Sequence, residues 1–299
     1  MFKNVIVGVD GEEGGRDAIA LAKLLGAADG VLTLVYVYRS DPYVVWAESS
    51  SPYDAAEPER AQDLLDSAKE QAGLEARLRI HGSSSVGCGL HELAEAIGAD
   101  LIVVGSSRRG SFGRVLIGDD TRASLNGAPC AVAIAPAGYS AQPVLMREIG
   151  VGYDGSPESE HAVRFAKQLA HLHGTKLSAL QAVYFPSAYA GRVSPDDPTI
   201  EGMIDAAREQ IAALGGVEPH AALGHPAEEL ALYSASLDLL VVGSRSYGPI
   251  GRLVHGSTAQ QLARTARCPL LVLTRAARQV QAPGTSGRKR ETAGPGAAR

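Results

Sequence analysis

The segment Asn4-Val5-Ile6-Val7-Gly8-Val9-Asp10-Gly11 is a short apolar run ending in Asp-Gly, and it returns as Glu148-Ile149-Gly150-Val151-Gly152-Tyr153-Asp154-Gly155. Two further segments return in the same order, 101–106 as 239–244 and 110–118 as 248–256. The offset between copies is 144 residues at the first landmark and 138 at the later ones. The chain therefore contains two copies of one structural plan, which differ in loop length.

Each copy alternates apolar runs typical of strands with segments of helical periodicity. In the first copy we expect strands at 4–9, 31–38, 76–81, 101–104 and 130–135, and helices at 16–26, 58–73, 90–98 and within 111–126. In the second copy we expect strands at 149–153, 177–184, 218–223, 239–242 and 270–274, and helices at 159–173, 200–214, 227–237 and 257–266. Strands separated by helices predict right-handed βαβ units, and hence an α/β fold of two tandem Rossmann-like domains with parallel sheets.

The repeat also predicts the domain boundaries. Residues 1–137 form the first domain, 138–146 the linker and 147–275 the second domain. The linker contains Gly138 and Pro143 and has no strong periodicity. Residues 276–299 are rich in Gly, Pro, Ala, Thr and Arg, which predicts a disordered tail. This tail carries a net charge of +4, which favours a solvated segment over a contact with an acidic partner.

Bulk composition excludes several classes of protein. The chain has 299 residues, 45% of them hydrophobic, a net charge of −5 and three cysteines. No apolar run is long enough to cross a membrane, and the N-terminus lacks the pattern of a signal peptide. The body outside the tail is acidic, which argues against binding to nucleic acid. We therefore expect a cytoplasmic protein without a disulfide framework, with neither nucleic acid nor membrane as a partner.

The acid that ends the first strand of each copy, Asp10 or Asp154, is the first candidate site residue. In a parallel α/β sheet, ligands bind at the carboxyl ends of the strands, beside the point where the strand order reverses. A carboxylate there accepts hydrogen bonds from ribose hydroxyls or from an adenine amine. It equally accepts bonds from the backbone N–H groups of the next turn, and on the residue alone this capping role is favoured.

The second candidate is a glycine pattern after the fourth strand. In the second copy it runs Gly243-Ser244-Arg245-Ser246-Tyr247-Gly248-Pro249-Ile250-Gly251, and Gly256-Ser257-Thr258 then opens a helix. Glycines let backbone approach phosphate oxygens, and a helix N-terminus with hydroxyl side chains attracts an anion. An ordinary turn with a helix cap has the same pattern, so the phosphate site remains one of two interpretations.

Together these motifs resemble the universal stress protein family, whose nucleotide pattern is Gly, two residues, Gly, nine residues, then Gly-Ser or Gly-Thr. The resemblance covers nearly the whole chain, twice. It implies a five-stranded parallel sheet per domain in the order 3-2-1-4-5, with the two domains paired as a pseudo-dimer. In the ATP-binding branch of the family it also implies adenine and ribose near the first strand and phosphates in the glycine loop. The backbone near Val37 and Val183 is then expected to contact the adenine edge.

The sequence departs from the family pattern at several positions. The second glycine is replaced by Arg108 in the first copy and by Ser246 in the second. After the last glycine the second copy keeps Ser257, whereas the first has Asp119 and Asp120. Two carboxylates at a phosphate site repel an anion unless a metal ion lies between them. The sequence therefore favours the second copy as the better nucleotide site.

We thus predict an ATP-binding stress-response regulatory protein, with Mg²⁺ as a companion of ATP and at most slow hydrolysis, because no general base or lysine clamp is evident. A protein-interaction scaffold of the same fold that does not bind nucleotides is the alternative, and a nucleotide-using enzyme has little support. Expected partners are an adenine nucleotide, a second copy in a homodimer and an unidentified regulatory protein. The candidate binding residues are Gly152, Asp154, Val183, Gly243, Ser244, Arg245, Ser246, Tyr247, Gly248, Pro249, Gly256, Ser257 and Thr258, and, more weakly, Gly8, Asp10, Val37, Gly105, Ser106, Ser107, Arg108, Arg109, Gly110 and Gly118.

Other motifs are set aside. The stretch 150–155 matches the dinucleotide pattern GxGxxG, but its first glycines fall inside the expected strand. No P-loop and no GxSxG elbow occurs, and the eight histidines lack the spacing of metal ligands, so no metal site is expected. Cys130 and Cys268 begin strands, where thiols usually pack in the core, whereas Cys88 is the one expected to be exposed.

Overall fold

A computed structural model describes residues 1–40, 52–73, 75–106, 124–141, 145–184, 198–244 and 257–274. In the first half the elements are β1 (Phe2–Gly8), α1 (Glu13–Leu25), β2 (Gly26–Arg39), α2 (Pro52–Ala72), β3 (Arg77–Ser83), α3 (Val86–Ile97), β4 (Leu101–Gly105) and β5 (Ala131–Ala135). A short 3-10 helix, η2 (Tyr139–Ala141), follows. In the second half they are β6 (Glu148–Gly152), α5 (Pro157–His173), β7 (Lys176–Val183), α6 (Pro198–Ala212), β8 (Glu218–Leu223), α7 (Pro226–Tyr233), η4 (Ser234–Ser236), β9 (Leu239–Gly243), α8 (Ser257–Thr265) and β10 (Leu270–Leu273).

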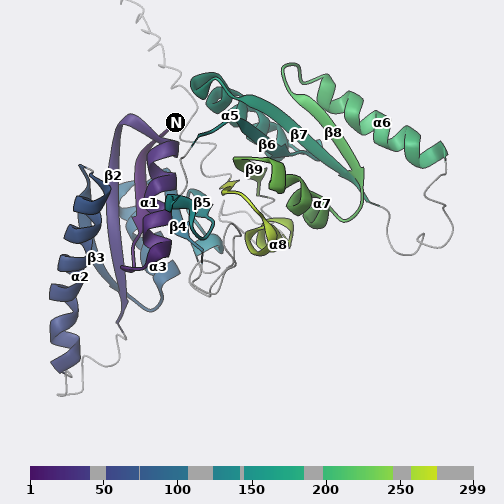
Figure 1. Cartoon of the computed structure of the whole chain (residues 1–299). Coiled ribbons are helices and arrows are strands. Elements are labelled where there is room, and N and C mark those ends of the chain that lie inside the picture. The colour runs from purple at the N-terminus through teal and green to yellow at the C-terminus, as the bar shows by residue number, and fades with distance from the viewer. Residues whose placement is uncertain are drawn as a thin grey trace, which may run out of the picture.

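The two halves share one ten-stranded sheet in the order β3-β2-β1-β4-β5-β10-β9-β6-β7-β8 (Figure 1). Within each half the neighbouring strands are parallel, which confirms the predicted order 3-2-1-4-5. Between the halves β5 pairs antiparallel with β10, with Ala133 opposite Leu271. The expected pairing of the two domains is therefore confirmed, and it takes the form of a continuous mixed sheet.

The element boundaries follow local chemistry. β4 and β9 carry the sequences LIVVG and LLVVG, and their first four residues are buried, as expected for central strands covered on both faces. α3 begins at Val86, earlier than the periodicity predicts, because the Ser85 hydroxyl accepts a hydrogen bond from Cys88 N–H and caps the helix. The helix predicted at 227–237 ends at Tyr233 and continues as η4.

Two apolar clusters cover the two faces of the sheet, and each contains residues of both halves. One contains Leu21 of α1 and Leu169 of α5, and the other contains Leu90 of α3 and Leu262 of α8. The rings of Phe2 and Phe165 join the halves directly, with their centroids 5.1 Å apart. The core therefore runs through the boundary between the halves.

Each half carries the same carboxylate clamp at the start of its central strands. Asp100 accepts hydrogen bonds from the N–H groups of Lys3 (2.8 Å) and Asn4 (3.0 Å). Asp238 accepts them from Arg147 (2.7 Å) and Glu148 (2.9 Å). These bonds tie β4 to β1 and β9 to β6 at the amino ends, so the carboxyl ends are aligned in the same way in both halves.

No helix among the described residues is long and apolar enough to cross a membrane. Of the predicted linker, residues 138–141 and 145–146 are described, whereas the predicted tail lies outside the described residues.

Candidate functional site

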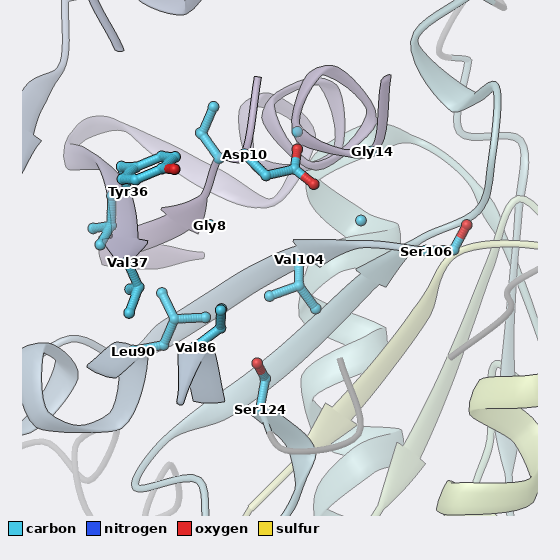
Figure 2. Close-up of a pocket in the computed structure, with 14 residues that line it drawn as sticks. Gly8, Asp10, Gly14, Tyr36, Val37, Val86, Leu90, Val104, Ser106 and Ser124 are labelled. Atoms are coloured by element: carbon cyan, nitrogen blue, oxygen red, sulfur yellow. The ribbon is translucent and has the colours of Figure 1, made fainter. Parts of the chain in front are cut away.

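A pocket of ≈160 Å³ lies at the carboxyl ends of β1, β2 and β4 in the first half (Figure 2). The first turn of α1 and the start of α3 complete its walls. Figure 2 places Tyr36 and Val37 on one side and Ser106 on the other, with Asp10 near the start of α1. The lining residues are Gly8, Val9, Asp10, Gly14, Gly15, Val35, Tyr36, Val37, Val86, Leu90, Val104, Gly105, Ser106 and Ser124.

The sequence predicted five of these residues, namely Gly8, Asp10, Val37, Gly105 and Ser106. It missed the two glycines that open α1, Gly14 and Gly15, and the apolar residues of α3. Their signal was present in the sequence as a Gly-Gly pair just before the helix expected at 16–26. Because the observed α1 begins at Glu13, the pair lies in its first turn, where glycine is unfavourable unless space is needed.

Asp10 holds the turn between β1 and α1. Its Oδ1 accepts a hydrogen bond from Glu12 N–H at 3.0 Å, while Glu12 itself, the N-cap residue of α1, makes no side-chain capping bond. This is the capping role that the residue alone favours. Asp10 is exposed, and Oδ2 accepts no hydrogen bond from the residues that the structure describes. One carboxylate oxygen thus remains available to a ligand in the pocket.

Gly105 is required for packing whether or not a ligand binds. A Cβ atom added at Gly105 would lie 2.1 Å from the carbonyl oxygen of Gly14, a separation that no side chain tolerates. The end of β4 therefore approaches the first turn of α1 through two glycines. Gly8 has more space, because its added Cβ would meet Leu90 and Val104 at 3.5 Å.

Ser106 and Ser244 follow the two glycines that end β4 and β9. Their backbone N–H groups donate to Ala135 and Leu273 at 2.9 Å in equivalent bonds. Both hydroxyl oxygens are buried, and neither has a hydrogen-bond partner within the described part of the chain. A buried hydroxyl without a partner costs roughly 1–3 kcal/mol, so a polar group that reached it would stabilise the site.

The backbone of Val37 faces the pocket. In a parallel sheet, successive residues of a strand direct their N–H and C=O groups to opposite neighbouring strands. Val9 N–H donates to Val35 C=O at 2.9 Å, so the backbone groups of Val35 and Val37 face the β1 side. Ser40 N–H donates to Ser83 C=O at 3.0 Å, so the backbone groups of Ser40 face β3. The next bond of the ladder, from Val37 N–H to Val9 C=O, is absent from the described backbone hydrogen bonds. One donor and one acceptor of Val37 are therefore directed at the space beyond β1.

In the second half the position equivalent to Val37 is one residue earlier than the predicted Val183. Gly8 lies opposite Val35, whereas Gly152 lies opposite Leu180, so Val37 corresponds to Ala182. The C=O of Val183 accepts a bond from Gly224 at 3.0 Å and therefore faces β8. The sequence paired Val37 with Val183, because without the register the two strands align by their apolar ends. Ala182, and not Val183, therefore carries the backbone groups equivalent to those of Val37.

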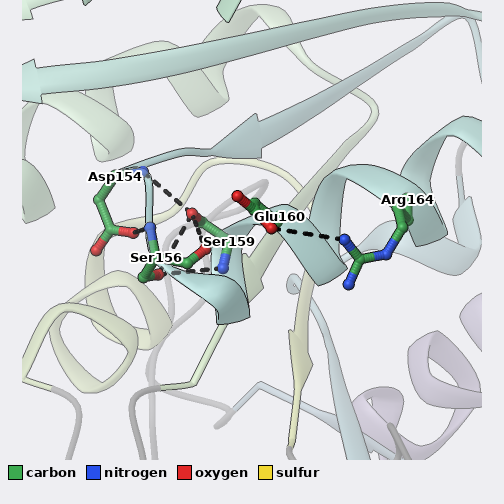
Figure 3. Close-up of polar contacts among 5 residues, drawn as sticks. All are labelled: Asp154, Ser156, Ser159, Glu160 and Arg164. Atoms are coloured by element: carbon green, nitrogen blue, oxygen red, sulfur yellow. Dashed lines mark hydrogen bonds and ion pairs between the residues drawn. The ribbon is translucent and has the colours of Figure 1, made fainter. Parts of the chain in front are cut away.

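The turn of the second half carries a denser hydroxyl network (Figure 3). Asp154 Oδ1 accepts from Ser156 N–H at 3.0 Å, which repeats the bond of Asp10. Ser156 caps α5 by accepting from Ser159 N–H at 3.2 Å, and Ser159 Oγ donates back to Ser156 C=O at 2.9 Å. Further along α5, Glu160 pairs with Arg164 at 3.7 Å. Where the first half has a Gly-Gly pair, the second half therefore has a capped and filled turn.

Gly243 makes the same close approach as Gly105, since its added Cβ would lie 2.6 Å from Glu158 C=O. Gly152 is more confined than Gly8, with Leu230 and Val242 at 3.1 and 3.2 Å from its added Cβ. Gln181, the counterpart of Tyr36, has a buried Oε1 without a hydrogen-bond partner among the described residues. The strand ends of both halves thus carry buried polar atoms that have no hydrogen-bond partner among the described residues.

Most of the predicted phosphate loop lies outside the described residues. Ser257 begins α8 and is followed by Thr258, as the sequence predicts. The remaining predicted residues lie outside the described residues: Ser107, Arg108, Arg109, Gly110, Gly118, Arg245, Ser246, Tyr247, Gly248, Pro249 and Gly256. Asp119 and Asp120 lie there too.

The cysteines match the sequence interpretation. Cys130 and Cys268 are buried and Cys88 is exposed. Burial raises the pKa of the Cys130 thiol to about 12, with a smaller contribution from Asp100, and burial also raises the pKa of Cys268. Within the described residues, no group of three or more His, Cys, Asp or Glu side chains is placed to hold a metal ion.

The comparisons with known proteins agree with the fold. A universal stress protein from Mycobacterium tuberculosis is 28% identical over 293 residues, covering 90% of this chain and 96% of that protein. A shorter one from Thermus aquaticus is 31% identical over 141 residues, covering 43% of this chain and 99% of its own length. The crystal structure of a universal stress protein from Archaeoglobus fulgidus superimposes with a TM-score of 0.63 at 19% identity, covering 91% of this chain and 98% of that one. The model of the universal stress protein family matches residues 1–136 and again 146–274, and the chain therefore belongs to that family, in its tandem two-domain form.

Proposed function

We propose that this protein binds an adenine nucleotide and acts as a regulator in the stress response. The observation that carries the proposal is the first-half pocket, which joins an apolar wall to polar groups at the ends of parallel strands; one of them, the Ser106 hydroxyl, has no hydrogen-bond partner among the described residues. Such clefts, apolar with a few convergent polar groups, are the usual form of small-ligand sites. Position beside the reversal of strand order, between β1 and β4, adds to this support.

The adenine ring is assigned to the apolar side of the pocket. Val86, Leu90 and Val104 supply a surface for a flat ring. The N–H of Val37 can donate to adenine N1, and its C=O can accept from the exocyclic amine. This donor–acceptor pair complements the edge of adenine and opposes that of hypoxanthine, in which both roles are reversed.

The ribose and phosphates are assigned to the glycine-rich side. Asp10 Oδ2, which accepts no hydrogen bond from a described residue, can accept from a ribose hydroxyl, and the hydroxyl of Ser106 lies at the start of the predicted phosphate loop. The rest of that loop, including Arg108 and Gly110, stays a prediction from the sequence. Mg²⁺, if it accompanies ATP, would offset the carboxylates of Asp119 and Asp120.

The described pocket adds support for a site in the first half, whereas the sequence favours the second half through Ser257. We propose that the first half holds the adenosine part of the nucleotide and that a second nucleotide occupies the second half. ATP occupancy would then shift the protein between conformations or assemblies, with hydrolysis slow at most. We also propose a cytosolic location and a regulatory protein partner. A homodimer would use surfaces other than β5 and β10, because each of these strands already has two neighbours.

Counting bound nucleotide tests the proposal. The chain is purified and denatured, and the released adenine nucleotide is counted per chain, before and after incubation with ATP and Mg²⁺. Ser106→Asp and Ser244→Asp place a carboxylate at equivalent positions, and each should abolish binding in its own half. Ser67→Asp, on the exposed face of α2, is the charge control and should bind as the parent does.

Two nucleotides per chain, falling to one in each variant, is the expected result. One per chain, lost in Ser244→Asp alone, would place the site in the second half. The absence of any nucleotide in the parent, with none bound from added ATP, would favour the scaffold of the same fold, which the departures at Arg108, Asp119 and Ser246 already suggest.

A further inference from the structure

The linker between the halves is held by one buried carboxylate. Asp17 of α1 is 1% exposed. Its Oδ2 accepts a hydrogen bond from Gly138 N–H at 2.8 Å, and its Oδ1 accepts from both Ser140 N–H and Ser140 Oγ at 2.7 Å. Gly138 takes a positive φ of 78°, which turns the chain toward the carboxylate. We refer to these three bonds as the Asp17 clamp.

The clamp positions Tyr139 between the two halves. Tyr139 begins η2 and packs against the apolar cluster that contains both Phe2 and Phe165. Burial raises the pKa of its phenol well above the usual value, and Asp238 and Cys268, both from the second half, add to the effect. A residue of the linker is therefore part of the contact between the halves.

The strands that meet at this boundary are able to pair with another copy of the chain. β5 and β10 end equivalent repeats and pair antiparallel, through Val132 with Val272 and Ile134 with Leu270. The same edges are present in every copy of the protein. The segment from the end of β5 to the start of β6, residues 136–147, spans up to ~40 Å when extended, so the linker alone does not force the halves to pair within one chain.

We propose that the Asp17 clamp reserves the β5–β10 pairing for the two halves of one chain, and that without it a second copy of this chain supplies the partner strand. The clamp fixes the linker beside β5 and inserts Tyr139, which raises the effective concentration of the chain's own second half. Exchange of equivalent elements between copies is a low-cost route to a dimer when the connecting segment is released.

The test compares two carboxylate clamps in the full-length chain. Asp17→Ala removes three hydrogen bonds to the linker. Asp100→Ala is the matched control, because it removes two bonds to backbone N–H groups of β1 and does not touch the linker. Both variants lower the stability of the first half, but the proposal predicts exchange between chains for Asp17→Ala alone.

A cysteine pair across the boundary reports which strands are paired. Ala133→Cys and Leu271→Cys lie opposite each other and on the face of the sheet away from Cys130 and Cys268. Cys88→Ser removes the exposed native thiol. After warming, cooling and oxidation with copper phenanthroline, pairing within a chain gives a cross-linked monomer, and pairing between chains gives a covalent dimer on denaturing gels.

The expected result is a cross-linked monomer in the parent and in Asp100→Ala, and at least ~10-fold more covalent dimer in Asp17→Ala, because the loss of even one of the three hydrogen bonds to the carboxylate would give about this factor. Equal dimer in Asp17→Ala and Asp100→Ala, or abundant dimer in the parent, would overturn the proposal. Should Asp17→Ala fail to fold, Ser140→Ala removes one bond of the clamp, and it must then raise the covalent dimer by a smaller factor; no increase would again overturn the proposal.

Discussion

The two halves of the chain reach one architecture through the same polar positions but finish their sites differently. Asp100 and Asp238 clamp the amino ends of the strands. At the carboxyl ends, Asp10 and Asp154 stabilise the same turn, and each accepts a hydrogen bond of 3.0 Å from the N–H group two residues later. The halves differ in the first turn of the helix that follows. In the first half Gly14 and Gly15 line a pocket, and in the second half Ser156 and Ser159 form a hydroxyl network.

The comparison separates residues that the fold requires from residues that a ligand requires. A feature present in both halves in the same geometry, such as the close approach at Gly105 and Gly243, belongs to the packing of helix on strand. A feature found in one half is a candidate for function. By this criterion the glycine pattern begins with a packing glycine, and the buried hydroxyls of Ser106 and Ser244 are shared features of the fold. The evidence for a ligand then rests on the pocket that Gly14 and Gly15 help to line.

The largest expected effect tests this packing role. Gly105→Ala forces a Cβ into a position 2.1 Å from Gly14 C=O, and Gly243→Ala forces one to 2.6 Å from Glu158 C=O. Overpacking against backbone costs ~3 kcal/mol or more, so both variants should unfold at lower urea concentration, Gly105→Ala at the lower of the two. Gly8→Ala is the control, because its Cβ has 3.5 Å of space, and it should lose well under half as much stability. Equal stability of all three variants would contradict the packing role.

The sequence predicted the succession of strands and helices along the chain because hydrophobic periodicity and the repeat are both local signals, whereas the order of the strands in the sheet was implied by the family resemblance. Strand β8 was predicted with its observed bounds, and β4 and β9 within one residue. Sequence alone did not predict that the two sheets join through β5 and β10, and the family resemblance implied only that the two domains pair as a pseudo-dimer. Pairing of two buried strands at a pseudo-two-fold axis leaves no local pattern.

The parts of the site that the sequence missed depend on register and on long-range contacts. The sequence predicted Val183, whereas the register makes Ala182 the equivalent of Val37. One residue of register reverses the direction of every backbone group along a strand. The linker was recognised by its lack of strong periodicity, which did not predict that Asp17, more than a hundred positions earlier, fixes Gly138 and Ser140. A carboxylate inside a helical pattern gives no sign of a partner so distant in the chain.

The second prediction concerns the base and sharpens the comparison of the sites. If Val37 and Ala182 present backbone N–H and C=O groups to adenine, then ITP, with both edge roles reversed, should bind ~10–100-fold more weakly than ATP. Titration calorimetry with Ser244→Asp reports the first half, and with Ser106→Asp the second. Equal affinity for ATP and ITP in either half would remove the backbone of that half from base recognition.

The third prediction decides between the two roles of the turn carboxylate. Asp10→Ala and Asp154→Ala each remove an acceptor of the turn, so each should cost ~1 kcal/mol of stability. Asp10→Asn and Asp154→Asn keep an oxygen acceptor and should fold with nearly parental stability. A ligand role adds a loss of ATP affinity of roughly threefold to tenfold in the Asn variants, because hydrogen bonds to a charged acceptor are the stronger ones. Asn variants with parental affinity would leave both acids as turn residues alone.

The smallest expected effect concerns the stability contributed by two histidine–glutamate pairs, one at each outer strand, β3 and β8. His81 Nε2 lies 2.7 Å from Glu92 Oε2, whereas His220 lies 3.7 Å from Glu218. The hydrogen bond to His81 lowers the pKa of Glu92 below its ordinary 4.5, aided by Ser83. A carboxyl with a lowered folded pKa contributes stability above its ordinary pKa and loses it as pH falls through the folded pKa.

Because the Glu92 side chain is 55% exposed, the contribution is under ~1 kcal/mol. Thermal unfolding across the acid range should therefore show Glu92→Gln slightly less stable than the parent above pH 4.5 and equal to it in stronger acid. Glu218→Gln should change the pH dependence of thermal stability less than Glu92→Gln does. A larger change for Glu218→Gln would contradict the inference that the shorter pair, His81–Glu92, contributes more stability.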